Sequence, residues 1–368
     1  MNNKIIIFLF IGIFFLGIFF GTQIFTNNAP QHLVNQFTSI SGSNIDENRT
    51  ETVIDLEKFV NFKNQNDIIE KQKYMINFIW NEDELPKNYP EKIEKNFIDN
   101  RFEDLRNLES IEKITVSMEH NVKSIVYIFL AEESNQKLII YHQGHLGGFI
   151  NGKNTIQRFL DNGFSVAAFS MPLLGMNNQP VVDLKNIGSV KLLKHNQFIL
   201  LDTENFSSMK FFFSPINQTL NHLFKNHSFD EFHMIGISGG GWATSVYPAL
   251  DSRITKSFSV AGSIPLSLRD EIKDTGDYEH FNSEFYTKAN YLELYIMNSF
   301  GNERELIQIF NKFDPCCFSN IEDYTYAKQI NQILSEIGTG SFKIIIDDTH
   351  HEHKISNYII DLIIQKLS

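Results

Sequence analysis

Short apolar segments recur through the last two thirds of the chain, and their spacing predicts a sheet. Residues 113–118 and 123–129 are two apolar-rich segments that flank the polar turn at residues 119–121, which predicts a β-hairpin. Further strands are predicted at residues 137–141, 164–169, 232–237, 256–261, 306–310 and 342–346. Helical spacing lies between them, as in residues 155–162 and 357–367. This alternation predicts an α/β fold, with a mostly parallel sheet and helices on both faces.

Two long connections separate these predicted elements. Residues 173–208 mix Leu, Asn, Lys and Phe without a clear period, so we interpret them as a lid or substrate-binding flap. Residues 209–225 have helical spacing, but Pro215 is expected to interrupt that helix. The second connection, residues 265–304, contains an acidic and aromatic run at residues 277–281. Neither connection has a pattern that identifies a ligand.

The first 25 residues follow a different pattern. Residues 5–20 contain no charged or strongly polar side chain, and the run stays mostly apolar to Phe25. About 20 apolar residues in a helix span the hydrocarbon of a bilayer. Residues 21–25 do not supply the small residues of a signal-peptide cleavage site, so we favour a transmembrane signal anchor at residues 1–25 over a cleaved signal. Lys4 stays on the cytoplasmic side, which predicts a single-pass protein with its main domain outside the cytoplasm.

Residues 26–110 are predicted to form a stalk and a helical N-terminal extension. The beginning of this region is rich in Asn, Ser, Thr and Gln, a composition typical of flexible segments. From about residue 55 onward apolar residues recur at helical spacing, and Pro86 and Pro90 end the pattern. The third region, residues 111–368, is predicted to be the main domain.

Composition narrows the possible partners. The 368 residues are 42% apolar, enough to bury a sizeable core, and carry a formal net charge of -12. Such a charge argues against binding nucleic acid, because phosphate contacts need clustered Lys and Arg. The two cysteines, Cys316 and Cys317, are adjacent and cannot link distant segments. They lack the spacing of a redox motif, so we predict two small buried hydrophobic residues.

A serine stands at a predicted strand-to-helix corner. Ser238 follows the strand at residues 232–237, within the sequence GISGG, and a run of small residues typical of a helix start comes next. At so sharp a turn the serine is forced toward unfavourable backbone angles. Gly236 and Gly240 lack the bulk that would keep strand and helix apart. We therefore predict that Ser238 is a nucleophile. The alternative interpretation is a glycine-rich turn in which the serine has no catalytic role.

With these elements, residues 111–368 resemble the α/β-hydrolase superfamily, and its serine esterases in particular. GISGG matches the nucleophile elbow after the fifth strand, and the sequence QGH at residues 143–145 lies where the superfamily has its loop after the third strand. The resemblance implies that residues 111–368 form a catalytic domain without a cofactor. It also implies an oxyanion hole made by the backbone N–H groups of Gly239 and His145.

The superfamily's order of serine, acid and histidine implies where the acid lies. Asp314 follows the seventh predicted strand and precedes a proline that ends the strand, a position from which a carboxylate can reach an imidazole. Asp347 and Asp348, at the end of the eighth strand, are the rivals. We predict that Asp314 is the acid.

The histidine is implied to lie between the last strand and the final helix, for which Ser356 is a suitable N-cap. Three histidines occur in that loop, and His353 fits the superfamily pattern best, while His350 and His351 could also serve. Together with Glu352 these histidines could instead bind zinc. However, they lack the HExxH order and have no distant partner ligand.

The implied activity is hydrolysis of carboxylic esters through an acyl-enzyme. Ser238 would attack, His353 would take its proton and Asp314 would orient the imidazole. A peptidase or an acyltransferase could use the same residues on another small-molecule or acylated substrate. Outside enzymes, the chain could be a hydrolase-like fold kept as a binding module, but such a module would not need residues for all three roles.

Overall fold

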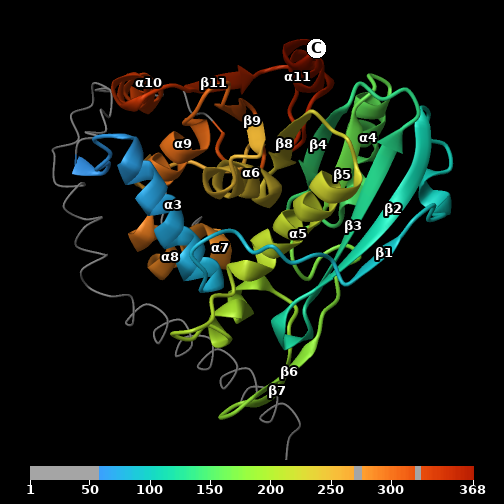
Figure 1. Ribbon diagram of the computed structural model, residues 1–368, viewed down its shortest axis with the longest axis horizontal. Helices are drawn as coiled ribbons and strands as arrows, with labels where there is room; N and C mark the ends of the chain where they lie inside the picture. The colour runs from blue at the N-terminus through green and yellow to red at the C-terminus, as the bar shows by residue number, and fades with distance from the viewer. Residues whose placement is uncertain (1–57, 269–275, 320–324) are drawn as a thin grey trace, which may run out of the picture. The chain divides into compact units, whose positions relative to one another are not determined.

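The computed structural model describes residues 58–268, 276–319 and 325–368. Its main sheet has nine strands, namely β1 (Lys92–Glu94), β2 (Leu108–Ser117), β3 (Lys123–Ala131), β4 (Lys137–His142), β5 (Ser165–Phe169), β8 (Glu231–Ile237), β9 (Ile254–Val260), β10 (Glu305–Asn311) and β11 (Ser341–Asp347). Their order is β1-β2-β3-β5-β4-β8-β9-β10-β11. The pairs from β1 to β5 are antiparallel, and every pair from β5 to β11 is parallel. The predicted mostly parallel sheet is confirmed (Figure 1).

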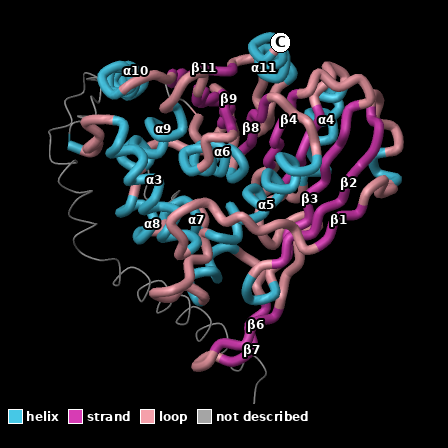
Figure 2. Tube along the Cα trace, in the orientation of Figure 1, coloured by secondary structure: helices cyan, strands magenta, loops and turns pink. Residues whose placement is uncertain are grey.

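Helices cover both faces of this sheet (Figure 2). They are α3 (Gln65–Trp80), α4 (Lys153–Leu160), α5 (Lys210–Asn226), α6 (Gly239–Leu250), α7 (Tyr278–Phe281), α8 (Ser283–Lys288), α9 (Tyr291–Ser299), α10 (Thr325–Ile337) and α11 (Asn357–Leu367). Alternate residues of each strand enter different cores, because successive side chains point to opposite faces. In β4, Ile140 joins the core under α5, α6 and α9, whereas Ile139 and Tyr141 join the core under α4 and α11.

Helix α5 continues through Pro215, so the predicted interruption is wrong. Proline removes one backbone N–H bond and crowds the preceding turn, which disfavours it inside a helix. Here the flanking Phe211, Phe212 and Ile216 are all buried in the core. Burial of such side chains contributes about 1.5 to 3 kcal/mol each, which offsets the lost hydrogen bond.

The predicted N-terminal extension contains a helix that packs into the core of the sheet. Asn64 and Asp67 form a capping box that begins α3. Met75 and Trp80 lie in the same core as α5 and α6, and Trp80 Nε1 donates a hydrogen bond to Ser214 Oγ at 2.8 Å. Within the described residues, α3 and the sheet therefore share one core.

The predicted membrane anchor, residues 1–25, and the stalk that follows lie outside the described residues. Among the helices of the described ranges, none combines the length and the apolar character that crossing a membrane requires. The anchor and the extracytoplasmic orientation remain predictions from residues 5–20 and Lys4.

The long insert forms a small second sheet and a short helix. Strands β6 (Val181–Leu184) and β7 (Gly188–Lys191) pair antiparallel, apart from the main sheet (Figure 1). A 3-10 helix, η5 (His195–Leu200), follows them. From the other connection, the Tyr278 hydroxyl donates to Asp202 Oδ2 at 2.7 Å, so the two long connections contact each other.

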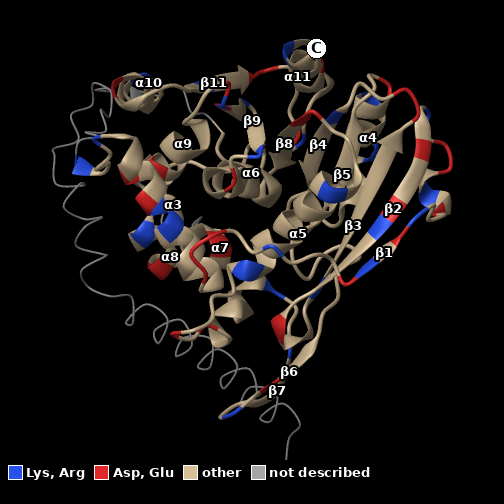
Figure 3. Ribbon diagram, in the orientation of Figure 1, with Lys and Arg blue, Asp and Glu red and all other residues tan. Residues whose placement is uncertain are grey.

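Charged residues line the edge of the main sheet at β1 and β2 (Figure 3). Glu94 lies 3.0 Å from Lys92 Nζ and 3.8 Å from Lys113 Nζ. Charges on an edge strand discourage pairing with another chain, because an unpaired strand edge otherwise offers its backbone to a partner. The charged side chains therefore protect the β1 edge of the sheet from pairing with a strand of another chain.

Next to this edge, Glu112 of β2 is buried and holds two histidines. Its Oε2 accepts hydrogen bonds from His222 Nε2 at 2.9 Å and from His227 Nε2 at 3.2 Å. Burial raises the pKa of the Glu112 carboxyl, but the two imidazole hydrogen bonds outweigh it and lower the pKa to about 2. Glu112 is therefore a charged, fully partnered group that ties α5 to β2.

We predict that Glu112→Gln reduces the free energy of unfolding by about 1 to 3 kcal/mol at pH 7. The ionised carboxylate stabilises the folded chain above its unfolded pKa near 4.3, and this stabilisation disappears as the pH falls toward about 2. The difference between wild type and variant in urea unfolding should therefore shrink below about pH 4. Glu119→Gln, which removes an exposed ion pair with Lys210, is the matched control and should cost less than about 1 kcal/mol. A pH-independent difference would contradict the account.

Candidate active site

Ser238 occupies the turn between β8 and α6. Its backbone angles are φ 57° and ψ -125°, a conformation that non-glycine residues rarely adopt. The turn is held on both sides, because Ser238 N donates to Val260 O at 2.9 Å and Trp242 N donates to Ser238 O at 2.8 Å. Strain of this kind costs about 1 to 3 kcal/mol and persists only where the surroundings enforce it. The expected unfavourable backbone is thus present at Ser238.

The glycines two positions before and after Ser238 have no room for a side chain. A Cβ atom at Gly236 would lie 2.1 Å from the carbonyl oxygen of Gly240. A Cβ atom at Gly240 would lie 2.0 Å from the carbonyl oxygen of His142. The prediction that both positions need glycine so that strand and helix can close together is confirmed.

The loop after β4 lies against this turn. A Cβ atom at Gly144 would be 2.5 Å from the Ile237 carbonyl oxygen and 2.6 Å from Ser238 Cβ. The His145 ring lies against Gly239, since a Cβ atom there would be 2.5 Å from His145 Cε1. Gly239 begins α6, so its N–H is not needed within the helix. The two residues predicted to supply oxyanion donors are therefore neighbours beside Ser238.

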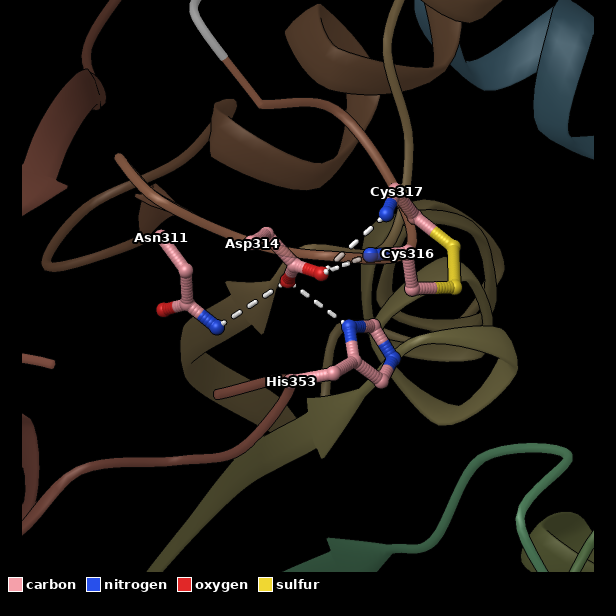
Figure 4. Close-up of a disulfide and its surroundings, with 5 residues drawn as sticks. All are labelled: Asn311, Asp314, Cys316, Cys317 and His353. Atoms are coloured by element: carbon pink, nitrogen blue, oxygen red, sulfur yellow. Dashed lines mark hydrogen bonds and ion pairs between the residues drawn. A yellow bond between two sulfur atoms is a disulfide. The ribbon is translucent and has the colours of Figure 1, made fainter. Parts of the chain in front are cut away.

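Asp314 and His353 are hydrogen-bonded to each other (Figure 4). Asp314 lies just after β10, and His353 lies in the loop between β11 and α11. His353 Nδ1 is 2.7 Å from Asp314 Oδ2. The other oxygen, Oδ1, accepts from the backbone N–H of Cys316 at 2.8 Å and of Cys317 at 3.1 Å. Asn311 Nδ2 also donates to Oδ2, at 3.3 Å.

These contacts determine which nitrogen of His353 carries the proton. Burial raises the pKa of Asp314, but the hydrogen bonds from His353 and from the Cys316 and Cys317 amides lower it below its ordinary value. The ionised carboxylate only accepts, so Nδ1 of the neutral imidazole carries the hydrogen. His353 Nε2 is buried and has no hydrogen-bond partner among the described residues, Ser238 included. It presents a lone pair that can accept a proton.

The rival acid Asp347 and the rival base His350 hold their own loop together. Asp347 accepts hydrogen bonds from Thr349 N, at 3.0 Å, and from the Ser356 hydroxyl. His350 Nδ1 accepts from Glu352 N at 3.1 Å, so its lone pair is already used. Burial raises the pKa of Asp347, but the Ser356 and Thr349 hydrogen bonds lower it below its ordinary value. His350 Nε2, like His353 Nε2, is buried without a hydrogen-bond partner among the described residues, but it lies 3.3 Å from Asp347 Oδ2 and so belongs to this loop's own contacts.

His351 and Asp348 lie on the surface of the same loop. His351 is exposed and stacks on Phe313 with ring centroids 4.4 Å apart, and Asp348 is exposed as well. In the described ranges, no group of side chains that could share a metal ion contains two of the three histidines of this loop. Of the three histidines, His353 is the one that contacts Asp314.

The prediction for the cysteine pair is wrong. Cys316 is exposed, Cys317 is half-buried, and a disulfide joins them (Figure 4). Composition alone favoured burial, but the pair follows the turn at Asp314, where its backbone N–H groups face the carboxylate. The turn thus keeps both residues near the surface.

A second cluster beside the loop after β4 escaped the sequence analysis. His145, His195, Asp277 and Glu279 bring their ligand atoms within 4.8 Å of one another. The acidic run at residues 277–281 was visible in the sequence, but His195 lies in an insert without a readable pattern. Because the cluster joins three distant segments, only the folded chain reveals it.

One cavity in the described structure lies away from these residues. It has a volume of about 330 Å³, and its lining includes Ile68, Gln72, Thr255 and Arg304. Thr255 is near the start of β9 and Arg304 precedes β10, whereas Ser238 follows the end of β8. The cavity is therefore at the opposite edge of the sheet and is not part of the Ser238 site.

The strand order, the turn at Ser238 and comparison with solved structures agree on the fold: the chain has the α/β-hydrolase fold. Acetyl xylan esterase 1 from Thermoanaerobacterium sp. JW/SL YS485 matches with a TM-score of 0.56 and 15% identity, over 84% of this chain and 96% of that chain. The acetyl xylan esterase from Paenibacillus sp. R4 matches with a TM-score of 0.53 and 13% identity, over 84% and 96%. Methylesterase BT1017 matches with a TM-score of 0.51 and 12% identity, over 83% and 64%.

No protein-family model matches the chain. No curated protein matches it in sequence. The identities to the solved structures are 15% or lower, so the likeness concerns the backbone arrangement. The roles of individual side chains must therefore be argued from the geometry of this chain.

We predict that Gly144→Ala strongly destabilises the chain, because its Cβ would overlap backbone and Ser238 atoms that cannot move independently. The melting temperature in a thermal denaturation experiment should fall by several degrees or more, which for a chain of this size corresponds to at least about 2 kcal/mol. The matched control is Gly188→Ala, where a Cβ meets nothing within 4 Å and only the positive φ of 93° is unfavourable. Equal melting temperatures for the two variants would show that the contact at Gly144 is not tight.

Proposed function

We propose that this chain is a serine hydrolase that cleaves carboxylic esters through an acyl-enzyme. The observation that carries the proposal is the 2.7 Å hydrogen bond between Asp314 and His353, which leaves His353 Nε2 buried and without a partner. The strained serine turn ends the parallel strand β8, and Asp314 follows the parallel strand β10. Carboxyl ends of parallel strands share one edge of a sheet, where ligands of such folds bind.

Acylation begins with attack of Ser238 Oγ on the ester carbonyl carbon. His353 Nε2 accepts the hydroxyl proton, and Asp314 stabilises the imidazolium that forms. The carbonyl oxygen becomes negatively charged, and the N–H groups of Gly239 and His145 donate to it. The imidazolium then gives its proton to the leaving alcohol as the C–O bond breaks, which leaves the acyl group on Ser238.

Deacylation repeats these steps with water. His353 Nε2 removes a proton from a water molecule, whose oxygen attacks the acyl carbon. The same two N–H groups stabilise the second oxyanion. The imidazolium then gives the proton to Ser238 Oγ as the bond between Oγ and the acyl carbon breaks, and a carboxylic acid leaves. Every proton transfer uses Nε2, which is why a buried Nε2 without a structural partner supports this role.

The names of the similar structures guide the choice of ester. Two are acetyl xylan esterases and one is a methylesterase. We therefore propose a small acyl or alkyl group, such as acetyl or methyl, on one side of the scissile bond. A peptidase or acyltransferase would use the same residues, and product analysis on a panel of acetyl esters, methyl esters and amides separates these activities.

A fluorophosphonate probe tests the nucleophile, because it modifies serines that an adjacent base activates. We predict that wild type is labelled, that Ser238→Ala is not, and that Ser189→Ala, a control on the exposed hairpin, is labelled like wild type. Equal labelling of wild type and Ser238→Ala would refute the assignment. Absence of labelling in a folded wild-type chain would favour a binding module.

Histidine variants test the base. His353→Ala should lower kcat/KM for the best ester by about 10³-fold or more, as expected when a member of such a triad is removed. His351→Ala removes an exposed ring and should leave kcat/KM nearly unchanged. If His353→Ala retains activity while His350→Ala loses it, the base is His350 and the proposed pairing with Asp314 is wrong.

A further inference from the structure

Four metal-ligand side chains from three distant segments meet beside Gly239. His145 comes from the loop after β4, His195 begins η5, and Asp277 and Glu279 lie at the start of α7. His145 Nε2 is 2.7 Å from Glu279 Oε1, 3.2 Å from Asp277 Oδ2 and 3.3 Å from His195 Nδ1. His195 Nδ1 is also 3.1 Å from Glu279 Oε2. The four groups therefore converge on one point.

The cluster buries a negative charge. The side chain of Glu279 has no exposed area, and that of His195 is 3% exposed. Asp277 adds a second carboxylate at the half-buried side of the cluster, where acidic residues gather at α7 (Figure 3). A buried carboxylate needs a compensating positive charge.

One ring nitrogen of His195 is hydrogen-bonded to a backbone carbonyl group, and this bond determines whether the other ring nitrogen can donate or accept. His195 Nε2 lies 2.8 Å from the carbonyl oxygen of Pro172, which can only accept, so Nε2 carries a hydrogen. In the neutral imidazole, Nδ1 then has a lone pair. That lone pair faces Glu279 Oε2, which is also an acceptor, at 3.1 Å. Two acceptors at this distance need either a second proton on His195 or a bound metal ion between them.

The described residues contain a second cluster of His and Glu side chains, around Glu112, in which no two acceptors face each other. At Glu112, the Asn226 amide Nδ2 lies 3.0 Å from His222 Nδ1, which makes Nδ1 an acceptor and puts the hydrogen on Nε2. His222 Nε2 can then donate to Glu112. This cluster is satisfied by hydrogen bonds between neutral imidazoles and a carboxylate. In the cluster at Glu279, the contact between His195 Nδ1 and Glu279 Oε2 cannot be such a hydrogen bond while His195 is neutral.

We propose that His145 Nε2, His195 Nδ1, Asp277 and Glu279 bind one divalent transition metal ion, with Zn²⁺ as the best fit. Zn²⁺ bound at about 2.0 Å by four tetrahedral ligands places those ligands about 3.3 Å apart. Three of the four contacts in the cluster, at 3.1, 3.2 and 3.3 Å, lie near that edge length, and the fourth, between His145 Nε2 and Glu279 Oε1, is shorter at 2.7 Å. Two carboxylates neutralise the charge of the ion, and the Pro172 carbonyl orients His195 as outer partners of ligating histidines do.

Four protein ligands define a structural rather than a catalytic ion. Catalytic zinc keeps one position open for water or substrate, whereas a closed tetrahedral site contributes to folding. The ion would link the loop after β4 to η5 and α7, and so to both long connections. Because the His145 ring packs against Gly239, binding would also hold the loop that carries one proposed oxyanion donor.

Metal binding to the full-length chain tests this site without reference to activity. The chain is stripped with a chelator, and Zn²⁺ is titrated by calorimetry with metal content measured in parallel. Wild type should bind one Zn²⁺ per chain and gain thermal stability. His195→Gln should weaken binding by more than about 100-fold, since even outer partners of a ligand contribute 10 to 100-fold. His227→Gln, the matched change in the Glu112 cluster, should bind like wild type.

Two further measurements keep the proposal testable if His195→Gln fails to fold. Asp277→Asn changes a half-buried ligand and should also weaken Zn²⁺ binding. Co²⁺ should give the intense visible absorption of a tetrahedral site in wild type and lose it in this variant. Failure of the folded wild type to bind stoichiometric Zn²⁺ would mean that a protonated His195 neutralises Glu279, and would overturn the site. Loss of binding in His227→Gln alone would move the site to Glu112. Either result leaves the proposed ester hydrolysis untouched.

Discussion

The close approach of three backbone segments at Ser238 is the constraint on which the rest of the site depends. Gly236 and Gly240 bring strand and helix into contact, and Gly144 lets the loop after β4 rest on the serine. None of these positions has space for a Cβ atom, so the strain at Ser238 is imposed by its surroundings. The same approach brings the His145 ring against Gly239, the residue that follows the serine.

The parallel pairing of β10 with β11 brings together Asp314 and His353, the other two residues of the candidate site. The register of β10 and β11 aligns Asn311 with Asp347, so the segments that follow these strands leave the sheet at the same edge. Asp314 and His353 come from those two segments and meet there at 2.7 Å. The cysteine pair contributes its backbone rather than its sulfur, because two successive N–H groups hold one carboxylate oxygen while the other faces the imidazole.

Local patterns in the sequence predict the parts of this structure that depend on neighbouring residues. The strands and α11 follow from apolar periodicity, and the turn at Ser238 follows from its glycines. Contacts between distant segments could not be predicted in this way. The pairing of Asp314 with His353 rather than His350 depends on how the last loop folds, and His195 meets Glu279 only through packing of the two long connections. The wrong predictions for Cys316, Cys317 and Pro215 have the same origin, because tertiary contacts outweigh local preference there.

The central claim is that Ser238, Gly239 and His145 act on one reacting carbonyl group. A crystal structure of the chain after reaction with a small alkyl phosphonate ester tests it most directly, because the bound phosphorus imitates the tetrahedral intermediate. The account predicts a bond from phosphorus to Ser238 Oγ, with the phosphoryl oxygen within about 3.1 Å of the backbone nitrogens of Gly239 and His145. Phosphorus bound to another residue, or a phosphoryl oxygen that neither amide contacts, would contradict it.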